Sequence, residues 1–498
     1  MAKIEAMQRR DRLRLAIFSA QMVVIGNRTI PIWLVAAFVF ALVLPWSLPA
    51  SERPSPWSER LLDERLQFDA AQHLDAQALV DRGRILFVGK FTSLDGAGRP
   101  LATQAIVPTR RKRPAEHAMQ RLAGPDASAC VSCHNEPTPG GAGDFVVNAF
   151  VSEGFTGADF DSVDRQFSNE RGTPHLFGAG LVELLAREMS ADLQALRRAA
   201  LQQARSSGHA VRVQLESKDV DFGTLSAEAD GSVDLSEIEG VDADLVVRPF
   251  SQKGVISSLR QFSVNALNAH HGIQAVERYG SRWTGDDDFD GDGVGSELLD
   301  GDVSALVAFQ ATLPPPERLR PKSGAWLAAA ERGERRFNAL GCATCHRPHL
   351  PLEHLVFTDP GPGTSAATLR IEDVDAPIAL DLSTLLGSDE FIRDDKGRLL
   401  VPIFGDLKRH AIADERVAPL GNELLAQRFV ARNDFLTAEL WGVASTAPYG
   451  HRGDMTTLDE VIRAHGGEAR FAREAYIDAG EGARDDIVAF LKTLTINP

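Results

Sequence analysis

The chain has 498 residues, 44% of them hydrophobic, and a formal net charge of −16 at pH 7. A chain of this length can form two or three domains with cores of their own, which excludes a small scaffold held together by disulfides. The acidic balance argues against a nucleic-acid partner. It favours a basic surface on any protein that docks here, or it simply keeps the protein soluble.

The N-terminus has the pattern of a membrane-targeting segment. Arginines at positions 9, 10, 12 and 14 precede an uncharged apolar run over residues 30–48, which has the length of a helix that spans a bilayer. We therefore predict a cytoplasmic segment at 1–29 and a transmembrane anchor at 30–49, in a single-pass protein of the bacterial inner membrane whose C-terminal part lies in the periplasm. A cleaved signal peptide is the alternative, although Leu48 lies where a small residue is wanted.

Two cysteine motifs follow a linker and a leading helix at 50–79. Residues 130–134 read Cys-Val-Ser-Cys-His, and residues 342–346 read Cys-Ala-Thr-Cys-His. In such a motif both thiols add to haem vinyl groups and the histidine becomes the proximal iron ligand. A zinc site would need cysteine pairs only about 12 to 20 residues apart, and a redox dithiol would not need the histidine. Since the motifs use all four cysteines, we predict two covalently bound haem c groups, attached at Cys130, Cys133, Cys342 and Cys345, with His134 and His346 on the irons.

The segment between the two motifs contains a predicted helix, a predicted β excursion and an acidic loop. A glycine-rich stretch at 171–183 leads into a helix that runs to about Gln203, and short alternating runs over 211–250 predict a small β excursion on a helical body. An acidic loop follows, in which Asp286 as position 1 puts carboxylates at positions 1, 3 and 5, glycine at 6 and Glu297 at 12. That spacing is typical of a calcium loop, although no clear helix enters it and an acidic surface turn is the alternative. The candidate calcium ligands are Asp286, Asp288, Asp290, Asp292 and Glu297.

The C-terminal part reads as a second helical domain. Three prolines at 314–316 mark the predicted boundary between an N-terminal haem domain at 80–316 and a C-terminal haem domain at 317–498. Thr457 and Glu460 predict a capping box, and the helix that it opens places His465 on an apolar face. A buried imidazole needs a partner, either an iron or a backbone carbonyl. The predicted fold is mainly α, with two cytochrome c-type domains, loop-rich connections and a small β excursion, preceded by the transmembrane helix.

Four stretches carry a resemblance to a known family. They are residues 332–337 running into the second cysteine motif, residues 406–410, the segment 440–451, and residues 465–469 (His-Gly-Gly-Glu-Ala). With these stretches the chain resembles the di-haem oxidoreductase family of peroxidase-like proteins, within the superfamily of bacterial di-haem cytochrome c peroxidases and MauG. The resemblance covers residues from about 80 to 498.

The resemblance implies two facing cytochrome c domains with a calcium ion between them. One haem would store an electron and the other would react with peroxide. His465 falls where the superfamily supplies the second axial ligand of the C-terminal haem, with His410 as the rival ligand. Glu183 is implied as an acid/base, and His175 as a sixth ligand or pocket residue of the N-terminal haem. The tryptophan that relays electrons in better-known members is not evident at its usual place, and Trp283 and Trp326 are the substitutes considered.

Two functions from different classes are compatible with these motifs. The first is a peroxidase-like di-haem oxidoreductase that reduces peroxide or uses it to oxidise a partner. The second is a non-catalytic di-haem electron-transfer cytochrome c, in which both irons carry six ligands. Either would exchange electrons with a redox protein partner. An oxygenase acting on an apolar substrate is a weaker third alternative, which no residue selects.

Overall fold

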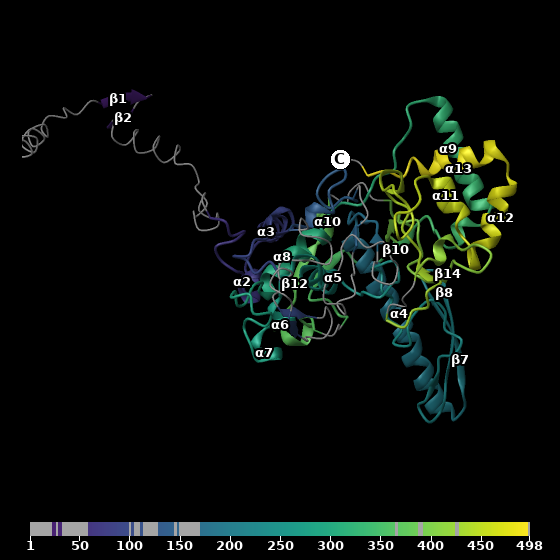
Figure 1. Ribbon diagram of the computed structural model, residues 1–498, viewed down its shortest axis with the longest axis horizontal. Coiled ribbons are helices and arrows are strands. Elements are labelled where there is room, and N and C mark those ends of the chain that lie inside the picture. Colours follow the sequence, from purple (N-terminus) through teal and green to yellow (C-terminus); the bar gives the residue numbers. More distant parts are fainter. Residues whose placement is uncertain are drawn as a thin grey trace, which may run out of the picture. The chain divides into compact units, whose positions relative to one another are not determined.

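The computed structural model describes residues 22–25, 28–31, 58–98, 101–103, 110–112, 128–143, 147–148, 170–363, 367–386, 392–423 and 428–496 (Figure 1). The chain divides into two compact units, Met1–Ser55 and Pro56–Pro498. The second unit contains both cysteine motifs.

The first unit corrects the prediction of a membrane anchor. Its described residues form an antiparallel hairpin, in which strand β1 (Met22–Ile25) pairs with strand β2 (Arg28–Pro31). Ile30 and Pro31, the first residues of the predicted span, thus belong to a strand, and residues 32–49 lie outside the described part. A short apolar run rich in Val, Ile and Thr suits a strand as well as a helix, and hydrophobicity alone cannot separate the two.

None of the described helices is long and apolar enough to cross a bilayer. This finding overturns the predicted transmembrane helix and, with it, the predicted location as a single-pass inner-membrane protein.

Two crossed helix pairs organise the second unit. Helix α3 (Ala76–Val88) packs on α8 (Asp300–Ala311), and α9 (Gly324–Ala339) packs on α13 (Glu481–Leu491), more extensively than any other described helices pack together. A Cβ at Gly83 would lie 1.8 Å from the carbonyl oxygen of Ala305, and one at Gly333 would lie 1.9 Å from that of Asp486. Only glycine allows the two backbones of each pair to approach so closely.

The two pairs also share their aromatic contacts. Phe87 and Phe337 each follow the crossing glycine by four residues and so lie one helical turn beyond it. The centroid of the Phe87 ring lies 5.0 Å from that of Phe309 on α8 and 6.2 Å from that of His134. The centroid of the Phe337 ring lies 5.4 Å from that of Phe490 on α13 and 6.4 Å from that of His346. One local arrangement of glycine, two phenylalanines and a motif histidine therefore occurs twice.

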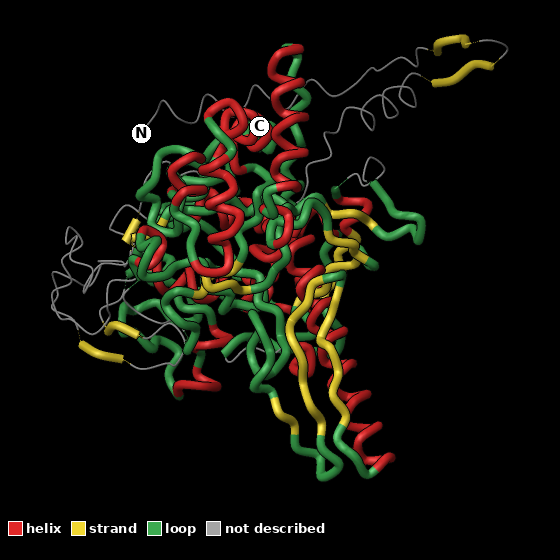
Figure 2. Tube along the Cα trace, turned by 90° about the vertical axis from the view of Figure 1, so that its right-hand side faces the viewer, coloured by secondary structure: helices red, strands yellow, loops and turns green. Residues whose placement is uncertain are grey.

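The prediction of a mainly α fold is also wrong, because seven small sheets lie among the described residues. The largest joins β7 (Val211–Ser217), β8 (Val220–Ala227) and β9 (Val233–Asp234) and lies along the C-terminal part of α4 (Ala179–Ser207), as Figure 2 shows. Apart from β1 with β2, the other five sheets also pair strands of two to four residues, which are too short to give a period-2 signal in the sequence. They are β3 (Leu101–Thr103) with β4 (Arg110–Lys112), β5 (Val147–Asn148) with β6 (Glu170–Arg171), β10 (Leu350–Leu352) with β13 (Leu399–Val401), β11 (Val356–Asp359) with β12 (Ile378–Asp381), and β14 (Arg409–Ala411) with β15 (Asp434–Leu436).

The remaining helices are short. They are α2 (Phe68–Gln72), α5 (Leu259–Ala266), α6 (Val276–Tyr279), α7 (Ser281–Thr284), α10 (Leu382–Leu385), α11 (Leu458–Arg463) and α12 (Arg470–Asp478). Three of them, α2, α5 and α11, pack on the two pairs. A π-helical turn, Leu267–His271, continues α5, and each cysteine motif forms one 3₁₀ turn, Cys130–Ser132 and Cys342–Thr344.

The buried apolar side chains form two clusters. The smaller one is built around Phe337, Phe404, Tyr449, Leu458 and Phe490. The larger one contains α3, α4 and α8, but it also includes residues from the last third of the chain: Leu350, Leu352, Phe357, Leu399, Val401, Ile403, Trp441 and Ile496. Residues beyond the predicted boundary at 316 thus contribute to both clusters, and the division into two haem domains stays a prediction.

Candidate functional site

The histidine of the first cysteine motif has the tautomer and the charge of a neutral metal ligand. His134 Nδ1 lies 2.9 Å from the carbonyl oxygen of Pro174. Because a carbonyl oxygen only accepts, Nδ1 carries the proton and Nε2 keeps its lone pair for a metal. Burial lowers the pKa of His134 to about 4, so the ring is uncharged at neutral pH.

The second motif repeats this arrangement. His346 Nδ1 lies 3.3 Å from the carbonyl oxygen of Phe404. Burial, with a further contribution from the neighbouring His465, lowers the pKa of His346 to about 4. Here too Nε2 remains available to a metal.

His465 faces the second motif across a gap that fits an iron. Its Nδ1 donates to the carbonyl oxygen of Val461 at 2.7 Å, and burial lowers its pKa, which leaves a neutral ring with Nε2 available. The centroids of the His346 and His465 rings lie 6.4 Å apart. Two metal–nitrogen bonds of about 2 Å each, with half a ring at either end, span roughly 6 Å. The donor set therefore fits a haem iron held between two imidazoles.

A buried hydroxyl in the smaller apolar cluster has no hydrogen-bond partner in the described part of the chain. Tyr449 is 6% exposed and packs in the smaller cluster with Leu458 and Ala464. Its hydroxyl group has no hydrogen-bond partner among the described residues, and burial raises its pKa. A buried polar group without a partner costs about 1 to 3 kcal/mol, so this atom too suits a cavity that a polar cofactor fills.

His410, the rival ligand, is held on both sides by carboxylates. Its Nδ1 lies 2.7 Å from Glu468 Oε2, and its Nε2 lies 2.8 Å from Asp406 Oδ2. Burial, the largest single cause, would lower the pKa of His410, but the hydrogen bonds and charge interactions with Asp406 and Cys345 together outweigh it, and the pKa rises to about 11. A protonated ring with both nitrogens bonded has no lone pair for iron. The geometry therefore favours His465.

Glu183 is fully engaged within the protein. Its Oε1 lies 2.6 Å from Arg187 Nη2, and its Oε2 accepts a hydrogen bond of 2.8 Å from the backbone N–H of Leu259, the first residue of α5. Burial raises the pKa of Glu183, and the Arg187 guanidinium opposes that shift. These contacts give Glu183 a structural role in joining α4 to α5, and its acid/base role stays a prediction.

His175 contacts a tryptophan that sequence reasoning missed. His175 Nε2 lies 2.9 Å from the carbonyl oxygen of Trp441, which is 266 residues away and only 3% exposed. His175 Nδ1 is buried without a hydrogen-bond partner among the described residues, and burial lowers the pKa of the ring to about 4. By contrast, Trp283 is 53% exposed and Trp326 donates to Ala489 between α9 and α13.

A short chain of hydrogen bonds joins the two motif histidines. Pro174, which accepts from His134, precedes His175 in sequence, and Trp441, which accepts from His175, follows Leu440. The Leu440 N–H donates to the same Phe404 oxygen that accepts from His346. The four steps are His134 Nδ1 to Pro174 O at 2.9 Å, His175 Nε2 to Trp441 O at 2.9 Å, Leu440 N to Phe404 O at 3.3 Å and His346 Nδ1 to Phe404 O at 3.3 Å.

The acidic loop gathers three of the five predicted calcium ligands. Carboxylate oxygens of Asp288, Asp290 and Asp292 lie within 4.8 Å of one another. Glu297 lies close by at 3% exposure, and burial, with Asp290 as the next cause, raises its pKa well above the usual value. Asp286 pairs instead with Arg110 at the surface, at 3.0 Å. The cluster therefore begins at Asp288 and not at Asp286.

We expect calcium to bind this cluster and to stabilise the protein. Several carboxylates so close together repel one another, and a divalent cation neutralises them. At free calcium one hundred times the dissociation constant, binding adds about 2.7 kcal/mol to the free energy of unfolding. Chelation should lower the thermal midpoint accordingly, as followed by circular dichroism. Asp290→Asn should abolish the calcium found by elemental analysis, whereas Asp286→Asn should not. If a chelator changes the thermal midpoint of neither the unaltered protein nor the Asp286→Asn variant, this loop is a surface turn.

A buried histidine elsewhere in this unit makes stability sensitive to acid. The His451 ring stacks on Phe435 at 4.6 Å, and its Nε2 lies 3.3 Å from Glu423 Oε1. Burial, and then the nearby cations Arg171, Lys253 and Arg452, lower the pKa of His451 to about 3.

His451 is therefore expected to stabilise the fold fully above its unfolded pKa of about 6.5 and progressively less as the pH falls toward 3. Between pH 7 and pH 5 the free energy of unfolding should fall by about 2 kcal/mol on its account. His451→Gln should remove that part of the pH dependence in denaturant titrations at the two pH values. His209→Gln, at an exposed position, is the control and should keep that pH dependence. If the free energy of unfolding changes equally between the two pH values in the unaltered protein and in both variants, His451 is not its source.

Comparisons with solved structures give distant likenesses, among them a hydrazine synthase and a MauG-like protein. No family model matches the chain, and no curated protein matches it. Hydrazine synthase from Kuenenia stuttgartiensis is 12% identical with a TM-score of 0.37, over 91% of this chain and 99% of that one. A MauG-like protein associated with microbial copper homeostasis is 15% identical with a TM-score of 0.26, over 64% of this chain and 88% of that one. Identities and TM-scores this low transfer neither a fold nor an activity.

Proposed function

We propose that this chain is a di-haem c-type oxidoreductase of the cytochrome c peroxidase type, which reduces peroxide or uses it to oxidise a partner. The observation that carries the proposal is the repeated unit of crossed helices, two phenylalanines and a motif histidine whose Nδ1 is held by a backbone carbonyl. Each copy would belong to one haem domain, at 80–316 and at 317–498.

The residues present fit two haem groups. Cys130, Cys133, Cys342 and Cys345 would form the thioether links, and His134 and His346 would be the proximal ligands. A bound haem iron supplies one-electron chemistry and, where its sixth position is open, reaction with peroxide. The carbonyl groups of Pro174 and Phe404 fix the orientation and the tautomer of the two proximal rings.

The two centres differ on the side opposite the proximal histidine. His465 faces His346 at 6.4 Å. Near the first motif the imidazoles are engaged otherwise: His175 Nε2 lies 2.9 Å from the Trp441 carbonyl oxygen, and His271 Nε2 lies 3.7 Å from Cys130 Sγ. We therefore assign electron storage to the C-terminal centre and the peroxide reaction to the N-terminal centre. The hydrogen-bonded path through His175 and Trp441 supports electron exchange between them.

The second candidate is a non-catalytic di-haem electron-transfer cytochrome c. One observation favours it: both oxygens of Glu183 are used within the protein, so this carboxylate has no free oxygen to handle a proton at the N-terminal centre. Both candidates need a redox protein partner. The net charge of −16 would favour a basic one, whose association should weaken as salt is added.

Optical and electron paramagnetic resonance spectra of the purified ferric protein distinguish the two candidates. The oxidoreductase is expected to show two haems per chain by the pyridine haemochrome assay, one low-spin and one high-spin, and to consume peroxide when a reductant is present. Two low-spin haems that do not respond to peroxide would reject the oxidoreductase and support the electron-transfer cytochrome. The absence of covalent haem would reject both.

A further inference from the structure

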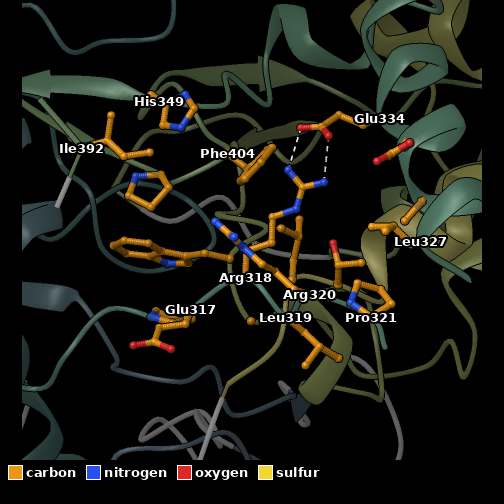
Figure 3. Close-up of a pocket in the computed structure, with 18 residues that line it drawn as sticks. Glu317, Arg318, Leu319, Arg320, Pro321, Leu327, Glu334, His349, Ile392 and Phe404 are labelled. Carbon is orange, nitrogen blue, oxygen red and sulfur yellow. Dashed lines mark hydrogen bonds and ion pairs between the residues drawn. The ribbon is translucent and has the colours of Figure 1, made fainter. Parts of the chain in front are cut away.

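A pocket of about 580 Å³ lies beside the C-terminal helix pair and contains none of the cysteine-motif residues and not His465. Its walls come from the segment 316–321, from α9 and from the residues around Phe404 and Trp441. Figure 3 shows Leu327 and Ile392 on opposite sides of the pocket, with Phe404 and Arg318 between them. Its volume is in the range of pockets that take small organic molecules.

Part of the rim of this pocket is apolar and exposed. Leu319, Leu327 and Ile392 are 36%, 42% and 66% exposed, and they are three of the ten large hydrophobic side chains that are exposed among the described residues. Three such side chains around one hollow leave apolar surface in water, which a bound apolar molecule would cover.

The aromatic residues of the pocket connect it to both candidate haem centres. Phe404 and Trp441 are 5% and 3% exposed and both line the pocket. The carbonyl oxygen of Phe404 accepts from His346, and that of Trp441 accepts from His175. A molecule seated here would therefore contact the two residues whose backbone carbonyls accept hydrogen bonds from His346 and His175. Aromatic rings prefer to pack against other aromatic rings in offset or edge-to-face geometry.

The charges of the lining do not suit an anion. Arg318 forms two hydrogen bonds of 2.7 Å to Glu334, drawn as dashed lines in Figure 3, so its charge is matched within the wall. In total the lining holds two arginines, Arg318 and Arg320, against three glutamates, Glu317, Glu331 and Glu334. A carboxylate, sulfonate or phosphate would find no excess positive charge here.

We propose that this pocket binds a small, uncharged, flat aromatic molecule, which is the substrate of the two centres. Its role as substrate rests on the proposed oxidoreductase function, whereas its binding does not. Leu327 and Ile392 would cover its faces, and Phe404 and Trp441 would place it beside both centres.

The test uses the ferric full-length protein and isothermal titration with three probes of similar size. We expect 2-naphthol to bind, and its saturated analogue 2-decalol and the anion 2-naphthalenesulfonate to bind at least tenfold more weakly, because the first lacks the aromatic ring and the second meets three glutamates. Leu327→Glu should raise the dissociation constant of 2-naphthol about tenfold, because apolar contact is lost. Leu94→Glu is the matched control, since Leu94 is also 42% exposed and does not line the pocket, and it should change nothing.

The proposal is overturned if 2-naphthol does not bind, if 2-decalol binds equally well, or if the two leucine variants behave alike. Unchanged haem spectra in both variants would establish that they are folded. The titration requires neither peroxide nor turnover, so its outcome is separate from that of the spectra that test the oxidoreductase function.

Discussion

Replacing His465 by alanine is expected to convert one low-spin haem to high-spin while both covalent haems remain attached. The change removes the imidazole that faces His346 at 6.4 Å and whose Nδ1 is already bonded to Val461. An iron that loses one of two imidazole ligands keeps only the proximal one or gains water, which is a weaker ligand. Optical and electron paramagnetic resonance spectra would show the loss of one full low-spin signal per chain.

His410→Ala is the matched control for this experiment. It removes a ring that lies between Asp406 and Glu468, at 2.8 and 2.7 Å, and so has no nitrogen left for iron. The spin state should stay as in the unaltered protein, although stability should fall because a buried carboxylate loses its partner. If His410→Ala gives the high-spin signal and His465→Ala does not, the two histidines exchange roles.

Gly333→Ala is expected to destabilise the C-terminal half by about 3 kcal/mol or more. The added Cβ would lie 1.9 Å from the carbonyl oxygen of Asp486 and 2.9 Å from the Cβ of Phe490, so α9 and α13 must move apart. The helix pair carries Phe337 and hence the packing around His346. Thermal or denaturant unfolding would measure the loss, and the yield of covalent haem should fall as well.

Gly482→Ala supplies the control on the partner helix. A Cβ at Gly482 meets nothing within 4 Å, so alanine should stabilise α13 by up to about 1 kcal/mol. Gly83→Ala, whose Cβ would lie 1.8 Å from Ala305 O, should lower the free energy of unfolding as Gly333→Ala is expected to. Similar small changes in stability for all three glycine variants would mean that the helices do not cross so closely.

Local features could be predicted from the sequence because neighbouring residues determine them. The capping box of Thr457 and Glu460 is confirmed at the start of α11. The two cysteine motifs likewise needed only their own spacing to be found. The predicted anchor failed at its first residues, Ile30 and Pro31, which belong to a hairpin strand, because a few apolar residues do not distinguish a helix from a strand.

Features that join distant residues escaped the sequence reading. The contact of His175 with Trp441 spans 266 residues, and nothing local marks either residue for the other. The acidic loop can be read in two registers with alternating aspartates, and the pairing of Asp286 with the distant Arg110 goes with the register that begins at Asp288.

One missed signal was present in the sequence as an internal repeat. Residues 82–87, RGRILF, correspond to residues 332–337, RGERRF, and the segment 307–313, VAFQATL, corresponds to 488–494, VAFLKTL. A comparison of the chain with itself would have predicted both helix crossings, since each repeat contains the crossing glycine or the facing phenylalanine.

The larger apolar cluster has a consequence for the order in which the protein matures. A ribosome completes α3 and α8 before it makes Leu350, Val401, Trp441 and Ile496, which belong to the same cluster. Domains usually fold in the order of their synthesis. Here the core that is begun first stays incomplete until Ile496 has been made, so the Cys130 motif would remain accessible longer than its place in the sequence suggests.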